Sequence, residues 1–161
     1  MMKDLEALFS PAVTEVFTTM LNYPTHEVTL ESQGIIPKNG ELQLASAVGI
    51  VGEFTGVIYL HFSATFARKL TCRLLHMSDQ EVDGEEIVND AMGEIANMVI
   101  GYIKSRLCEK GMVCAITIPS IVRGSHFSIE PVGVDERRVF MLKCDDGQFW
   151  AEALAKNEKS K

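Results

Sequence analysis

A long helix that is apolar around most of its circumference constrains the fold of this chain more than any other feature. The pattern predicts a helix over residues 85–109, ended by Gly111. At about 100° per residue, apolar side chains cover roughly two thirds of its circumference. Such a helix must be mostly buried, so a partner can reach only its narrow polar arc. That arc holds Glu86, Asp90, Gly93, Glu94, Asn97, Gly101 and Lys104.

Two polar residues on this arc form a candidate site. Glu94 and Asn97 are three residues apart and therefore neighbours on one face of the helix. Gly93 and Gly101 flank them, and residues without side chains would let another backbone approach closely. A carboxylate and a carboxamide on an otherwise apolar helix therefore indicate a binding or catalytic site.

Composition limits the class of protein. The chain has 161 residues, of which 47% are hydrophobic and 23% charged, which favours one globular domain over residues 1–155 with a frayed tail at 156–161. A formal charge of −7 and the lack of a basic patch argue against nucleic acid as a partner. No signal segment or membrane-length apolar run is present, and the four cysteines lack Cys-x-x-Cys spacing. These features favour a cytoplasmic protein with reduced thiols.

The elements around the long helix are predicted from apolar periodicity and from turn residues. Before it we expect a helix from Ser10 to Leu21, a short strand at 26–30, a loop at 34–40, strands at 42–51 and 54–62, a helix from Ser63 to His76, and an acidic linker at 78–84. After it we expect a strand at 112–118, a loop containing Pro119, Gly124 and Pro131, and a hairpin of 138–144 and 149–155.

The order of these elements repeats. Helix, strand, loop and hairpin occur once before and once after the helix at 63–76, although the residues themselves do not repeat. We interpret this as a weak internal duplication. Hairpins with few crossovers favour an α+β fold, with a mainly antiparallel sheet covered by helices.

Several other stretches have simpler explanations than a site. The glycine-rich segment 49–56 lacks the lysine of a phosphate-binding loop and is not followed directly by a helix, so a hairpin turn is expected. The four histidines lack metal-ligand spacing, and no metal site is expected. No serine lies in a nucleophile elbow. Cys108 and Cys114 are expected to be buried rather than activated.

The Glu-x-x-Asn pattern occurs twice on the long helix. Glu86 and Asn89 form the first copy, and Glu94 and Asn97 form the second. Asn89 falls at the edge of the apolar arc, whereas both residues of the second copy lie within the polar arc. Asp90, four residues before Glu94, extends the polar arc by one turn. The second copy is therefore the better candidate.

The second copy resembles the motif of the CheX and CheC chemotaxis phosphatases. That motif has an acid or serine, three residues, a glutamate, two residues, an asparagine, and a proline about one strand later. Asp90, Glu94, Asn97 and Pro119 match it in order. The first copy has Val82 in place of the leading acid and no proline at the matching distance.

The similarity covers about residues 3–155. It includes the opening helix with Pro11 and the hairpin formed by 48–52 and 56–60. Some family members carry a second site on the first helix, but here Glu15 is followed by Thr18 where an asparagine would be needed. The resemblance therefore implies a CheC-like fold with a single active site of the CheX type, and a homodimer that continues its sheet across the interface.

The resemblance also implies a substrate, the phosphorylated receiver domain of a CheY-type response regulator, with magnesium held by the receiver. An acyl phosphate has a good leaving group, so the reaction needs little beyond a water held in line with the breaking bond. Asn97 can hold this water without repelling phosphate, because its amide is neutral and both donates and accepts. Glu94 is expected to pair with a lysine of the receiver.

Three further residues of the motif region have less direct roles. Asp90 either contributes to the contact or only keeps its turn solvated. Gly93 and Gly101 are expected to border the partner contact, and Pro119 to shape the strand or loop after the helix. No cofactor of the protein's own is expected.

Two rival functions belong to other classes. A domain of this fold could bind a receiver without hydrolysing anything, as a module similar to parts of the flagellar switch. A small-molecule enzyme is the other rival, but no nucleophile, cofactor loop or metal cluster supports it.

Overall fold

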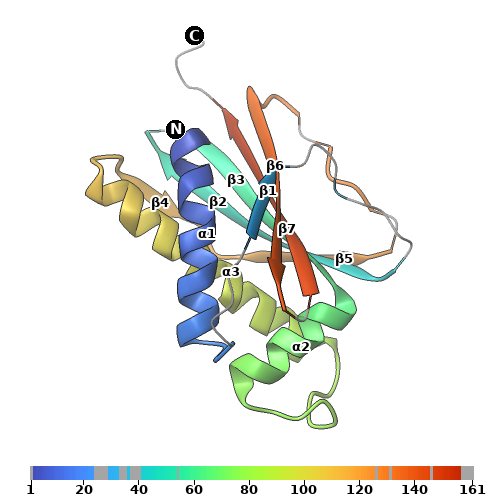
Figure 1. Cartoon of the computed structure of the whole chain (residues 1–161). Helices are drawn as coiled ribbons and strands as arrows, with labels where there is room; N and C mark the ends of the chain where they lie inside the picture. The colour runs from blue at the N-terminus through green and yellow to red at the C-terminus, as the bar shows by residue number, and fades with distance from the viewer. Residues whose placement is uncertain are drawn as a thin grey trace.

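The computed structural model is built on one seven-stranded sheet with helices across one of its faces (Figure 1). It describes residues 2–23, 29–32, 36, 41–53, 55–125, 127–130, 132–145 and 147–156. The three helices are α1 (Met2–Thr19), α2 (Ala64–Leu75) and α3 (Glu85–Glu109). The strands are β1 (Thr29–Ser32), β2 (Gln43–Gly52), β3 (Thr55–Ser63), β4 (Cys114–Ile116), β5 (Ser120–Gly124), β6 (Glu136–Cys144) and β7 (Gly147–Lys156). The α+β class predicted from the sequence is confirmed.

The sheet is antiparallel throughout, and its strand order reflects the predicted duplication. The order is β1-β6-β7-β3-β2-β4, with β5 also paired to β2. The hairpins β2–β3 and β6–β7 meet at the centre, where β3 pairs with β7. The short strand of each half lies beside the hairpin of the other half, β1 on β6 and β4 on β2. Two helix–strand–hairpin units therefore share one sheet by exchanging their short strands.

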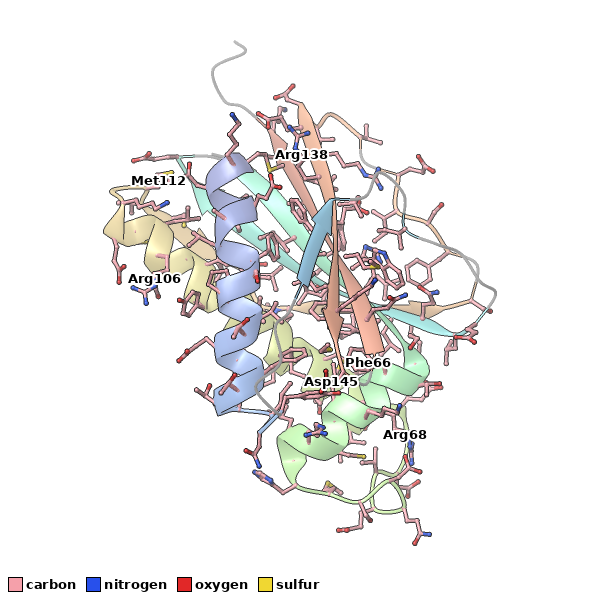
Figure 2. The ribbon with its side chains drawn as sticks, in the orientation of Figure 1. Phe66, Arg68, Arg106, Met112, Arg138 and Asp145 are labelled. Carbon is pink, nitrogen blue, oxygen red and sulfur yellow. The ribbon has the colours of Figure 1, made fainter. Side chains whose placement is uncertain are left out.

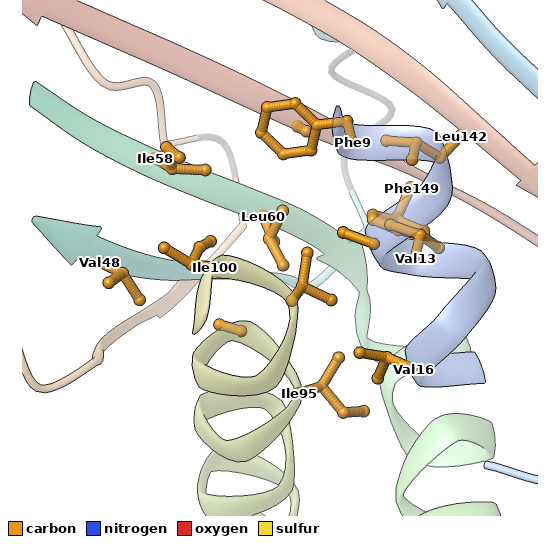
Figure 3. Packing of buried hydrophobic residues seen from close by; sticks show 14 of the residues in the cluster. Phe9, Val13, Val16, Val48, Ile58, Leu60, Ile95, Ile100, Leu142 and Phe149 are labelled. Atoms are coloured by element: carbon orange, nitrogen blue, oxygen red, sulfur yellow. The ribbon is translucent and has the colours of Figure 1, made fainter. Parts of the chain in front are cut away.

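The core lies between the sheet and helices α1 and α3 (Figure 3). Alternate residues of the strands point into it, among them Val48, Leu60 and Phe149, which are all at most 1% exposed. From the helices, Val13 and Ile95 meet them with no exposed surface. Burying side chains of this size contributes about 1.5–3 kcal/mol each, which explains why α3 is apolar over so much of its circumference.

Helix α3 matches the sequence prediction of 85–109. The predicted start of the first helix at Ser10-Pro11 is wrong, because α1 begins at Met2 and contains Pro11 in its interior. Met2, Leu5 and Phe9 extend the buried face by two turns before Pro11. Their burial outweighs the backbone hydrogen bond that proline cannot make.

Helix α2 and the linker that follows it hold the start of α3 in place. Ser63 caps α2, as predicted, because its hydroxyl oxygen accepts a hydrogen bond from the backbone N–H of Phe66 at 3.1 Å. Arg68 lies on the side of α2 that faces the linker (Figure 2). Its guanidinium donates to the Asp79 carboxylate and to the carbonyls of Asp79 and Val82, at 2.6–2.7 Å.

The predicted loop after residue 118 is wrong in part. Residues 120–124 form the edge strand β5, and the predicted strand at 112–118 shortens to β4. Ile50 of β2 faces Ile116, but Ala47 faces Ser120. One extra residue is therefore inserted between the two pairings, and Val48 alone lies opposite Ile118 and Pro119. This is a β-bulge, a position in a sheet that tolerates proline, which lacks an N–H for the ladder.

The remaining predictions concern the chain ends and connections. The hairpin of β6 and β7 is confirmed, and its turn packs on α2, since a side chain at Gly147 would collide with the Phe66 ring (Figure 2). Lys156, assigned to the tail from sequence, pairs with Thr55 at the end of β7. Residues 157–161, most of the loop at 34–40 and residues 26–28 of the predicted short strand lie outside the described residues.

Candidate active site

In the middle of α3, between residues 90 and 101, the polar residues lie in one narrow strip, which we call the α3 strip and define as Asp90, Glu94, Asn97 and Gly101. The side chains of Asp90, Glu94 and Asn97 are exposed, and Gly101 is half-buried. Ile95, Ala96 and Val99, which lie between them in sequence, have no exposed surface. None of the three polar side chains forms an ion pair or hydrogen bond with another described residue. The strip is therefore free to meet a partner.

Pro119 packs directly beneath the strip. Gly93 is buried, and a Cβ placed on it would lie 3.4 Å from Cγ of Pro119. Asn97 is one turn further along the same face of the helix. Helical side chains lean toward the helix N-terminus, so Asn97 leans toward the turn that holds Gly93. The missing side chain at Gly93 leaves room for the Pro119 ring beside this turn.

The two glycines of the polar arc differ in their surroundings. The close neighbour of Gly93 is Pro119 of this chain, so Gly93 is a packing residue within the fold. A Cβ on Gly101 would meet no atom within 4 Å among the described residues. Gly101 therefore lies in open space at the end of the strip.

Two polar contacts fix α3 against the sheet beside this strip. Ser46 of β2, which has no exposed surface, donates its hydroxyl to the carbonyl of Met92 at 3.2 Å. Arg123 of β5 donates from Nε and Nη2 to Oδ1 of Asn89, at 3.2 and 2.9 Å, and its Nε lies 3.8 Å from the Glu85 carboxylate. Ser46 and Arg123 were not predicted from the sequence, because neither position belongs to a recognisable motif.

The Asn89 contact separates the two Glu-x-x-Asn copies. The carboxamide of Asn89 is half-buried and is occupied by Arg123, whereas the carboxamide of Asn97 is exposed and makes no side-chain hydrogen bond to the described residues. The first copy therefore serves to join α3 to β5.

The glycine-rich stretch, the cysteines and the histidines were also weighed as candidate sites. Residues 49–56 belong to the β2–β3 hairpin, where side chains at Gly52 and Gly56 would collide with neighbouring carbonyls. Cys114 is buried, as predicted, and burial raises the pKa of its thiol. The predicted burial of Cys108 is wrong in part, because Cys108 is half-buried at the edge of the core. Within the described ranges, no group of three or more His, Cys, Asp or Glu is arranged to hold a metal ion. The described helices include none long and apolar enough to cross a bilayer.

Comparison with known proteins assigns the family. The family model described as chemotaxis phosphatase CheX matches residues 44–143, which include α3 and Pro119. The chain belongs to the CheX family. It is also similar to a protein of Thermotoga maritima named CheY-P phosphatase CheX, with 28% identity over 120 residues that make up 68% of this chain and 76% of the relative.

Solved structures show that the fold is that of CheX as well. The structure of chemotaxis protein CheX from Desulfovibrio desulfuricans matches with a TM-score of 0.75 and 24% identity, over 94% of this chain and 99% of that one. The CheX-CheY-BeF3-Mg²⁺ complex from Borrelia burgdorferi gives a TM-score of 0.74 and 22% identity, over 93% and 96%.

Proposed function

We propose that this protein hydrolyses the aspartyl phosphate of a CheY-type receiver domain, and that Glu94 and Asn97 carry the reaction. The observation on which this rests is the carboxamide of Asn97, which is exposed and makes no side-chain hydrogen bond to the described residues, on the mostly buried middle of α3 in a CheX-family chain. The name of the Thermotoga maritima relative, a CheY-P phosphatase, supports the substrate. The Borrelia burgdorferi complex of CheX with CheY supports the partner and places Mg²⁺ in that assembly.

Asn97 orients the attacking water. The water oxygen forms a bond to phosphorus while the bond between phosphorus and the aspartate oxygen breaks, which yields inorganic phosphate and a free receiver carboxylate. The transition state is loose, and the water protons pass to the released phosphate, so no strong base is needed. A neutral amide can accept from the water and donate to a phosphoryl oxygen at once. Positioning of this kind lowers the entropic part of the barrier.

Glu94 sets the position of the receiver. Its carboxylate is exposed one turn of the strip away from Asn97 and has no intramolecular ion pair within the described part of the chain. We expect it to pair with a lysine beside the receiver's phosphorylation site. Asp90, one turn earlier, adds a second negative charge that either joins this contact or keeps the turn solvated. Magnesium belongs to the receiver in this scheme. That the protein is a homodimer and is cytoplasmic stays a prediction.

The deciding experiment follows phosphate release from a pre-phosphorylated CheY-type receiver of the source organism. We expect the unmodified protein to accelerate release, Asn97→Ala to lose at least about 100-fold in kcat while still binding, and Glu94→Ala to raise KM instead. Full activity of Asn97→Ala would contradict the mechanism. Phosphorylation-dependent binding without any acceleration would instead favour the receiver-binding module.

A further inference from the structure

We infer that Ile118 is an apolar contact for the phosphorylated receiver and determines part of the affinity for this substrate; this inference depends on the proposed function. Ile118 immediately precedes Pro119 and is 87% exposed. A single exposed isoleucine is ordinary on a protein surface. Its position relative to the α3 strip is what gives this residue a role.

The β-bulge determines where Ile118 points. Thr117 still pairs with β2, since its N–H donates to the Gly49 carbonyl at 2.9 Å and its hydroxyl accepts from the Gly49 N–H at 2.9 Å. Pairing resumes at Ser120 opposite Ala47. In an uninterrupted strand Ile118 would lie opposite Val48, which has no exposed surface and faces the core. The extra residue turns Ile118 out of the core and gives Pro119 the inner place.

Pro119 then fixes the distance between Ile118 and the catalytic residues. Its ring is in contact range of Gly93, which directly precedes Glu94 and lies one turn below Asn97. Ile118 is the residue before this proline, so its backbone lies next to the turn of α3 that holds Gly93 and Glu94, and its side chain is exposed there. Bulges next to active sites commonly redirect one side chain in this way.

The chemistry of the combined surface fits a receiver. The strip supplies negative charge at Asp90 and Glu94 for a lysine, and a neutral amide for the phosphoryl group, but it contains no large apolar side chain. Interfaces commonly depend on a few apolar anchors surrounded by polar groups. Ile118 supplies such an anchor at the border of the strip. The surface that it contacts is the apolar surface next to the receiver's phosphorylation site.

The test is Ile118→Ser, with Val113→Ser as the matched control. Val113 is 69% exposed and precedes β4, at the opposite end of α3. At about 1.5 Å per residue, α3 runs roughly 12 Å from Gly101, the last residue of the strip, to Glu109, so Val113 lies beyond the end of the strip. Both substitutions remove an exposed branched apolar side chain, and thermal unfolding of both variants should match that of the unmodified protein.

We expect Ile118→Ser to raise KM for the phosphorylated receiver about tenfold with kcat nearly unchanged, and Ile118→Leu to restore KM. The dissociation constant for a receiver loaded with BeF3⁻ and Mg²⁺ should rise by a similar factor. Val113→Ser should change neither quantity.

The outcomes separate this inference from the proposed function. Unchanged KM and binding in Ile118→Ser, with Asn97→Ala inactive, would overturn the role of Ile118 and leave the phosphatase standing. If the unmodified protein binds without hydrolysis, the phosphatase fails and the binding constants alone decide the role of Ile118. If the unmodified protein does not bind the receiver, both proposals fail.

Discussion

The two Glu-x-x-Asn copies on α3 have the same residues in the same spacing and opposite environments. Asn89 receives two hydrogen bonds from Arg123 of β5, while Asn97 makes no side-chain hydrogen bond to the described residues. Asn89 is half-buried at the sheet, and Asn97 is exposed one turn after Gly93. The comparison shows that two copies of one motif can differ in whether the fold occupies their polar groups, as it does at Asn89, or leaves them exposed, as it does at Asn97.

Replacing asparagine by aspartate at Asn97 and at Asn89 should give the largest difference in dephosphorylation rate between two variants. In Asn97→Asp a negative charge replaces the neutral amide that, in the proposed mechanism, faces the phosphoryl group, so we expect dephosphorylation to slow by about 100-fold. In Asn89→Asp the new carboxylate faces the Arg123 guanidinium, so the rate should stay within about twofold and the protein should unfold at the same or higher temperature. Equal loss of rate in both variants would remove the distinction between the copies.

Gly93 and Gly101 offer a second comparison, in which we expect an intermediate difference in melting temperature and dephosphorylation rate. A leucine at Gly93 would occupy the place of the Pro119 ring, so Gly93→Leu should lower both the melting temperature and the rate of dephosphorylation, the rate by about tenfold. A leucine at Gly101 enters open space, so Gly101→Leu should keep its melting temperature, and any loss of rate there would reflect contact with the receiver. If Gly93→Leu kept full stability and rate, Pro119 would not support the site.

Glu152, on the face of the sheet opposite the helices, provides a control for substitutions in the α3 strip. Glu152 is 1% exposed; burial opposes its ionisation, but His61 and Arg137 outweigh burial and hold the pKa of its carboxyl below the ordinary value. Its Oε2 accepts a hydrogen bond from Arg137 at 3.2 Å and lies 3.7 Å from His61. A lowered pKa in the folded state means that this stabilisation is present above the unfolded-state pKa and is lost as the pH falls through the folded-state value.

Glu152→Gln should therefore lower the free energy of unfolding at neutral pH by about 1–3 kcal/mol and make its decline in acid less steep. Urea unfolding between neutral and acid pH measures both effects. Because Ala151 and Ala153 face the helices, Glu152 points away from them, and dephosphorylation by the folded variant should be unchanged. A steeper acid decline in the variant would contradict this sign.

Much of the fold could be predicted because the sequence patterns that specify it lie within single helices and strands. The 25 residues of α3 repeat an apolar pattern over seven turns, and Ser63 caps α2 through its own side chain. The errors occurred where distant contacts outweighed local preference. Pro11 lies inside α1 because the residues before it bury a continuous face, and β5 forms because β2 supplies a partner for its backbone.

The sequence by itself determined that α3 is buried and that its polar arc carries Glu94 and Asn97, since a helical period assigns every residue to a face. Only the tertiary structure decided which of the two asparagines is free and what lies beneath the strip. Arg123 and Pro119 reach α3 through the pairing of β4 and β5 with β2 and through a one-residue bulge in that pairing. Register is set by contacts between distant segments, and a one-residue change of register reverses which side chains face the core and which face the solvent.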